Sequence, residues 1–105
     1  MAWTWLLLAG CCEIAWALAL KFTDGFRRPL PSLFTAAAIA ASMFFLARAA
    51  RSLPIGTAYA VWTGIGIVGT AVGGMWLFAE SRQPLRLVSI ALILAGLIGL
   101  RFGHA

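Results

Sequence analysis

Charged side chains are scarce in this sequence, and acidic ones most of all. Only three of the 105 residues are Asp or Glu, and charged residues make up 10% of the chain, against 63% that are hydrophobic. Soluble domains carry about 25% charged residues. So apolar a composition excludes a soluble domain built around an ordinary core.

Residues for metal binding and nucleophilic catalysis are also few. The chain has one histidine and two cysteines, and Cys11 and Cys12 are adjacent within an apolar stretch. This pattern indicates neither a metal site nor a disulfide. Both cysteines are interpreted as small packing residues, because a free cysteine behaves as a small hydrophobe. Since the sequence offers no nucleophile–base pair, we expect no enzymatic activity and no cofactor.

Four windows almost free of charge divide the chain. They are Ala2–Leu20, Pro29–Ala47, Ser52–Ala79 and Leu87–Leu100. A helix needs about 20 mostly apolar residues to cross the hydrocarbon core. The third window also holds a loop before a helix that begins near Thr57, and the short fourth window is flanked by arginines that can reach the headgroups. We predict an all-α membrane protein, with residues 1–105 forming one domain of four transmembrane helices at about 2–20, 30–48, 57–78 and 84–101.

Basic residues outnumber acidic ones, giving a net charge of +5. In a soluble chain this excess would suggest a nucleic-acid partner, but basic and aromatic residues are not interleaved as on a nucleic-acid surface. The basic residues instead cluster at the ends of the windows, where anionic lipid headgroups attract them. The lipid bilayer, and not nucleic acid, is therefore an expected partner.

The basic residues also divide almost evenly between the two sides of the membrane. One side carries Lys21, Arg27, Arg28, Arg82 and Arg86, and the other carries Arg48, Arg51, Arg101 and the N-terminal amine. The positive-inside rule requires a clear excess on one side. This weak bias favours insertion in both orientations, although insertion in a single orientation stays open.

Four short helices are too few to surround a substrate and a water path, so we expect an oligomer. In the fourth window, Ala91, Ala95 and Gly99 recur every four residues, and Gly96 adds a second notch with Gly99. Small residues at this spacing let helices approach closely in lipid, either between chains or within one chain. An antiparallel homodimer would explain the weak charge bias, because its two chains insert in opposite orientations. It would also place a site between inverted units, as in many transporters.

Glu13 is the only acidic residue inside an apolar window. A carboxylate at that depth costs about 2.5–3.5 kcal/mol to insert, and such residues usually mark a proton or ion pathway. The nearest cation in its helix, Lys21, lies two turns away at the membrane edge. We therefore predict that a proton or a cationic substrate neutralises Glu13, the alternative being a purely structural role.

Gly10 and Trp16 share a helix face with Glu13. Gly10 leaves space beside the carboxylate, and Trp16 supplies an indole one turn along, unless it faces lipid. Ser42 offers a hydroxyl near the middle of the second window, unless it only bonds back to a carbonyl of its own helix.

In the third window, Tyr59, Trp62 and Gly66 fall on a common stripe. The Tyr59 hydroxyl and the Trp62 indole N–H can both donate to a buried carboxylate. Membership of the aromatic belt at the membrane surface is the alternative for these two side chains. We predict a binding site with Glu13 at its centre and these aromatic and small residues as its lining.

Glycines crowd the rest of the third window. Glycine is tolerated in membrane helices but weakens them, and helices bend at such places. Gly64 and Gly66 follow the aromatic pair and are predicted to form a hinge, whereas Gly69 and Gly73 are interpreted as packing notches.

Three strings of this sequence resemble the small multidrug resistance transporters. They are Gly10-Cys11-Cys12-Glu13-Ile14-Ala15-Trp16-Ala17, the whole segment Leu53–Gly66, and Gly96-Leu97-Ile98-Gly99-Leu100. The resemblance spans nearly the whole chain. Within this family, the strings Met1–Trp3, Lys21–Phe26 and Trp62–Gly66 are similar to those of the guanidinium-exporter subtype.

The resemblance implies an antiparallel homodimer in a bacterial inner membrane that exchanges protons for guanidinium-like cations. It gives Glu13 the role of the shared proton and substrate site, and it places Trp16, Ser42, Tyr59 and Trp62 in a hydrogen-bonding ring around it. Met43 departs from the larger aromatic residue expected beside Ser42. That departure leaves open how readily the site admits substituted substrates.

Two other functions stay open at this stage. The first is a broader exporter of quaternary ammonium and other lipophilic cations with the same fold. The second is a membrane assembly subunit that transports nothing, in which Glu13 joins helices by hydrogen bonding. Exchange transport requires that the helices reorient only when a proton or a substrate has neutralised Glu13.

Overall fold

Each of the four charge-poor windows forms an α-helix. The computed structural model describes residues 2–103, and over that range it holds the long helices α1 (Ala2–Ala19), α2 (Pro29–Ala49), α3 (Ile55–Leu77) and α4 (Pro84–Gly103). All four are long and apolar enough to cross a bilayer, which confirms the prediction of an all-α membrane protein with four spans. Met1, which belongs to one of the subtype strings, lies outside the described residues, as do His104 and Ala105.

Prolines mark where three of the helices begin. Pro29 and Pro84 are the first residues of α2 and α4, a position where the missing N–H has no helical partner to lose. Pro54 is the N-cap of α3, so that helix begins at Ile55 and not near Thr57 as the sequence suggested. At the other end of the chain, α4 continues to Gly103, beyond the predicted end at residue 101.

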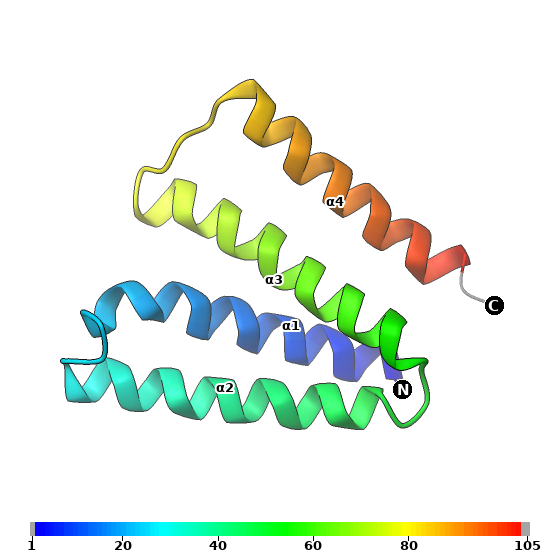
Figure 1. The fold of residues 1–105 in the computed structure, drawn as a ribbon, viewed down its shortest axis with the longest axis horizontal. Coiled ribbons are helices and arrows are strands. Elements are labelled where there is room, and N and C mark those ends of the chain that lie inside the picture. The colour runs from blue at the N-terminus through cyan, green and yellow to red at the C-terminus, as the bar shows by residue number, and fades with distance from the viewer. Residues whose placement is uncertain (1, 104–105) are drawn as a thin grey trace.

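Thr23 closes the turn between α1 and α2. It ends the 3₁₀ turn η1 (Leu20–Thr23), where its hydroxyl donates to the carbonyl of Leu20 at 2.8 Å and accepts from the backbone N–H of Phe26 at 3.2 Å. Gly25 follows with φ of 67°, a conformation that glycine adopts without strain. The turn therefore reverses the chain tightly, and α2 runs back along α1 (Figure 1).

The four helices form a thin assembly, with α1 between α2 and α3 (Figure 1). Within the described residues, α4 packs mainly against α3, and it reaches α1 through Arg101, whose Cζ lies 4.9 Å from the centre of the Trp3 ring. The assembly measures 44 × 35 × 16 Å, and a helix with its side chains is about 10–12 Å across. One chain is therefore too thin to enclose a pathway of its own.

The core lies at the end of the assembly where α3 begins. It is built by Leu6 and Ala9 from α1, Leu46 and Ala49 from α2, and Ala58 and Val61 from α3. Half of these residues are alanines, which let the helix backbones approach closely, as helices do in lipid.

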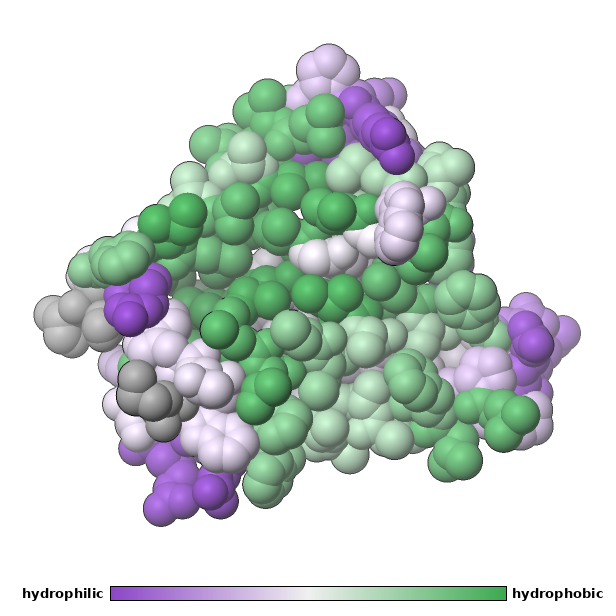
Figure 2. Space-filling view, turned by 180° about the vertical axis from the view of Figure 1, so that it is seen from behind, coloured by the Kyte–Doolittle hydropathy of each residue, from purple (hydrophilic) through white to green (hydrophobic). Residues whose placement is uncertain are grey.

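The outer surface is apolar around the middle and polar at its ends. Figure 2 shows hydrophobic side chains over the central band of one face, with hydrophilic ones gathered at the periphery. Large apolar side chains such as Leu30, Trp76 and Phe102 are about 80% exposed. Such exposure would be a liability in water, but it suits a chain whose solvent is lipid.

Glycines on α3 and α1 bring these two helices close together. A Cβ atom on Gly73 would lie 2.7 Å from Cδ1 of Leu18, and one on Gly69 would clash with the side chain of Ile14. On the α1 side, a Cβ on Gly10 would lie 2.9 Å from Cβ of Ile65. A larger residue at Gly69 or Gly73 would therefore push a side chain of α1 aside, as expected if these two glycines are packing notches.

We expect Gly69→Leu to destabilise the fold by about 1–3 kcal/mol, because overpacking a close helix contact forces its neighbours apart. The midpoint of thermal unfolding in detergent measures this loss. Gly56→Leu is the matched control, since it lies on the same helix and a Cβ there would meet nothing within 4 Å. Equal midpoints for the two variants would show that Gly69 is not a packing notch.

Candidate functional site

Glu13 lies in the middle of α1 and faces α3. A Cβ on Gly66 of α3 would lie 2.9 Å from Cγ of Glu13 and closer still to its carboxyl group, so the absence of a side chain at Gly66 makes room for the acid. Among residues 2–103, the buried Oε1 atom of Glu13 has no hydrogen-bond partner. The carboxyl group therefore keeps unused capacity to accept hydrogen bonds or to pair with a cation.

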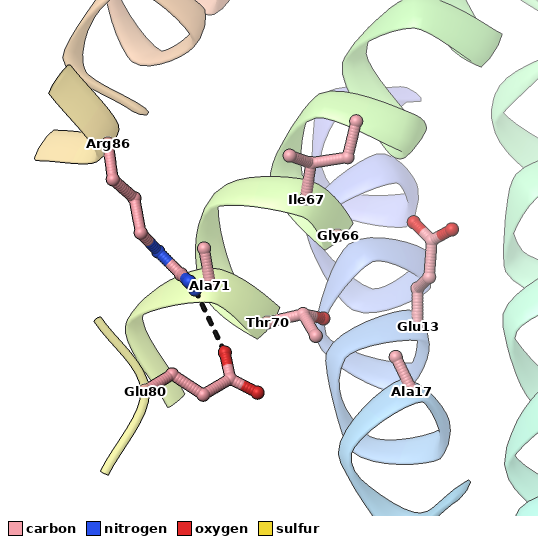
Figure 3. Close-up of a pocket in the computed structure, with 8 residues that line it drawn as sticks. All are labelled: Glu13, Ala17, Gly66, Ile67, Thr70, Ala71, Glu80 and Arg86. Carbon is pink, nitrogen blue, oxygen red and sulfur yellow. Dashed lines mark hydrogen bonds and ion pairs between the residues drawn. The ribbon is translucent and has the colours of Figure 1, made fainter. Parts of the chain in front are cut away.

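The Glu13 carboxyl group opens onto a cleft between α1, α3 and the loop that leads to α4. The cleft has a volume of about 390 Å³ and is lined by Glu13, Ala17, Gly66, Ile67, Thr70, Ala71, Glu80 and Arg86. Figure 3 shows Glu13 and Ala17 on one side, the Glu80–Arg86 ion pair on the other, and Thr70 between them. Small side chains and a few polar groups thus give a polyatomic cation of modest size both space and partners.

Ser42 joins three helices one turn away from Glu13. The fully buried Ser42 hydroxyl donates to the carbonyl oxygen of Ala9 on α1 at 2.8 Å and accepts from the indole N–H of Trp62 on α3 at 2.9 Å. The alternative that Ser42 bonds only to its own helix is therefore wrong. Since Ala9 lies four residues before Glu13, this network lies about one helical turn along α1 from Glu13.

The remaining predicted site residues are not brought into a single ring around Glu13. The Trp62 indole is committed to Ser42, and the Tyr59 ring lies 5.6 Å from that of Trp62. Tyr59 itself is 56% exposed and lines a different cleft, between α3 and α4. The indole N–H of Trp16 is buried without a hydrogen-bond partner in the described part of the chain. Within one chain, the predicted ring is therefore incomplete.

Sequence reasoning missed three polar residues of the cleft: Thr70, Glu80 and Arg86. Thr70 lies four residues after Gly66, so helical spacing could have found it. Its hydroxyl oxygen is buried and without a partner among the described residues. Glu80 and Arg86 lie at the ends of the third and fourth windows, where no periodicity signals that a loop folds one onto the other.

The predicted hinge glycines both lie at close contacts. Gly66 makes room for Glu13, and a Cβ on Gly64 would lie 3.0 Å from Cγ of Leu97 on α4. Gly64 is thus a point of close contact between α3 and α4. Bending at Gly64 and Gly66 stays a prediction.

The small residues of α4 lie on its exposed surface, and Gly96 also lines the cleft between α3 and α4. Ala91, Ala95, Gly96 and Gly99 are all exposed. A Cβ on Gly96 or Gly99 would meet nothing within 4 Å, because α4 meets α3 through other residues. This stripe therefore remains available for contact with another chain.

Comparison with known proteins places the chain among membrane exporters. Residues 1–93 match the family model described as Small Multidrug Resistance protein. A protein named guanidinium exporter from Yersinia pseudotuberculosis is 56% identical over 101 residues, covering 96% of this chain and 97% of that protein. Proteins of the same name from Citrobacter freundii and Escherichia coli strain K12 are each 54% identical, covering 96% of both chains.

We expect Ser42→Ala to lower the free energy of unfolding by about 1–3 kcal/mol, because the Trp62 N–H and the Ala9 carbonyl would both lose a buried partner. Denaturant-induced unfolding in detergent, followed by tryptophan fluorescence, measures the change. Ser89→Ala is the control, since the exposed Ser89 hydroxyl only bonds back to Leu85. A loss no larger than in this control would mean that the network does not stabilise the fold.

Proposed function

Because the chain belongs to the small multidrug resistance family, we propose that it exports guanidinium and related guanidinyl cations across the bacterial inner membrane in exchange for protons. The observation that carries this proposal is the intramembrane carboxyl group of Glu13, which opens onto a cleft and has a buried oxygen without a hydrogen-bond partner in the described part of the chain. The substrate class comes from relatives named guanidinium exporters, which are 54–56% identical over 96% of this chain.

Guanidinium suits a site centred on a carboxylate. It is flat, carries its N–H donors in its plane, and can form two parallel charge-assisted hydrogen bonds to one carboxyl group. Gly66 and Ala17 present almost no side chain to the cleft, so a planar cation can lie against Glu13. Thr70 supplies a further hydroxyl acceptor beside it.

Exchange with protons follows if Glu13 holds either a proton or the cation, but not both. A bare carboxylate inside hydrocarbon is costly, so the empty, charged site resists closing over. Protonation and cation binding each remove that charge. Helix rearrangement in only these two states carries one proton inward for each site that carries a cation outward.

The functional unit in this proposal is an antiparallel homodimer. Two observations support it: one chain is only 16 Å thick, and among residues 2–103 a Cβ on Gly96 or Gly99 of α4 would meet nothing within 4 Å. The half-exposed Tyr59 and the buried Trp16 indole, whose N–H has no partner among those residues, would then complete the ring around Glu13 together with the second chain. The even division of basic residues agrees with inverted protomers.

A broader exporter of quaternary ammonium cations is the second candidate. The exposed ring of Tyr59 beside Trp62 favours it, because cations without N–H donors bind to aromatic faces. Competition separates the two candidates. An excess of tetraethylammonium that leaves guanidinium transport unchanged supports guanidinium export, whereas strong inhibition favours the broader exporter.

We expect Glu13→Gln to lower proton-driven guanidinium transport to less than about a tenth of the wild-type rate, since losing one partner of a desolvated charge pair costs about 2–5 kcal/mol. Radiolabelled guanidinium uptake into proteoliposomes with an imposed pH gradient measures the rate. Asp24→Asn is the control, because it removes another carboxyl group at an exposed position. Flux through Glu13→Gln equal to that of a transporting wild type would contradict the proposal, and the same background flux with both proteins would support the assembly subunit.

We also expect Gly99→Leu to weaken the dimer by about fivefold or more, because overpacking a close contact costs about 1–3 kcal/mol. Dilution of fluorescently labelled protein into excess lipid, with energy transfer as the readout, measures the monomer–dimer equilibrium. Gly56→Leu again serves as the control. If the two variants dimerised equally well, the α4 stripe would not be the dimer contact.

A further inference from the structure

A second carboxylate lines the same cleft as Glu13 and is paired with an arginine. Nη2 of Arg86 lies 2.9 Å from Oε1 of Glu80, in a pair that joins the loop after α3 to the first turn of α4 (Figure 3). The side chains of Arg86 and Glu80 are 32% and 37% exposed. The pair is therefore reachable from outside, while the Oε1 atom of Glu13 is buried in the same cleft.

The fold itself positions the Glu80 carboxylate. The backbone N–H of Glu80 donates to the carbonyl of Gly74 at 3.3 Å, and a Cβ on Gly74 would lie 2.7 Å from the carboxyl carbon of Glu80. Ala79 takes a φ of 54°, which turns the loop back over the end of α3. Glu80 is thus held against a glycine at the cleft and does not extend freely into solvent.

The charges of the cleft leave one positive charge to be supplied. Its lining includes two carboxyl groups, Glu13 and Glu80, but only one cationic group, Arg86. When both acids are ionised, Arg86 can neutralise Glu80 and Glu13 remains unpaired. A single monovalent cation or a single proton completes the balance.

Arg86 carries the same chemical group as the proposed substrate. Its guanidinium donates to Glu80 at a distance typical of a charge-assisted hydrogen bond. A carboxylate held in this way offers free guanidinium the same interaction. The buried hydroxyl of Thr70 lies in the cleft between this pair and Glu13, with no partner of its own in the described part of the chain.

We propose that Glu80 is an outer binding site for guanidinyl cations, and that Arg86 occupies it as a tethered competitor which the incoming cation displaces. Thr70 lies on the path from this outer site to Glu13. The inference rests on the proposed guanidinium export and adds to it a second site in each chain. In this arrangement, Glu80 raises the local concentration of cation, and Arg86 keeps the outer site from holding the cation too firmly.

Removing the two members of the pair separates this proposal from a structural role. Arg86→Met frees Glu80 and should lower the KM for guanidinium transport, whereas Glu80→Gln removes the outer site and should raise it. Each change should be about two- to fivefold, the scale of one partly exposed ion pair. Arg82→Met is the control, because this arginine lies in the same loop but contacts the carbonyl of Met75 and not Glu80. Its KM should equal that of the wild type.

Opposite shifts of KM in the two variants support the outer site. Shifts of the same sign, or losses of maximal rate alone, are what a structural ion pair gives, and they would overturn the outer site while leaving guanidinium export intact. If the wild-type protein itself transports no guanidinium, the proposed export fails and the outer site fails with it.

A binding measurement tests the outer site when the inner site has been removed. In Glu13→Gln protein with ¹⁵N-labelled arginine, guanidinium chloride should shift the side-chain resonance of Arg86. Tetramethylammonium chloride at the same concentration should not, because it has no N–H donors. Equal responses to both salts would mean that only ionic strength acts on the pair, and the outer site would be rejected.

Discussion

The structure depends on one costly feature, a carboxyl group halfway along a helix that crosses hydrocarbon. Glu13 can remain there only if a proton or a cation neutralises it, since a bare carboxylate in lipid is expensive. The neighbouring helix accommodates the acid but does not satisfy it: Gly66 makes room for the carboxyl group, and its buried oxygen finds no partner among the described residues. A site built in this way is ready for an exchangeable partner.

Packing around Glu13 is uneven, and this unevenness suits a transporter. On one side, the buried Ser42 hydroxyl ties α1, α2 and α3 together through two hydrogen bonds. On the other, α4 packs mainly against α3 and reaches α1 only where Arg101 lies over the Trp3 ring, and no described residue of α4 is buried. The acid therefore lies between a firmly joined helix cluster and a helix that is free to contact a second chain. Membrane helices held by glycine notches and a few polar bonds can repack at modest cost.

Much of this could be predicted from the sequence, because its strongest signals are local. Charge-poor windows predicted the four helices, and the lone acid in one of them made Glu13 the candidate site. Contacts between residues of different helices were harder to predict. Ser42 and Trp62 were predicted as neighbours of the site, yet the acceptor of Ser42 is a backbone carbonyl at Ala9, which no side-chain pattern reveals. Tyr59 shares a stripe with Trp62 but lies in another cleft. Glu80 and Arg86 meet through a loop, where no periodicity applies.

The most direct test asks whether a proton and a guanidinium ion exchange at one carboxyl group. Guanidinium is added to purified wild-type protein in weakly buffered detergent solution, and the pH is recorded. If Glu13 holds one or the other, binding should release protons in proportion to the sites filled, and the solution should become more acidic. Saturable binding of guanidinium with no release of protons over the pH range where the protein transports would contradict the account.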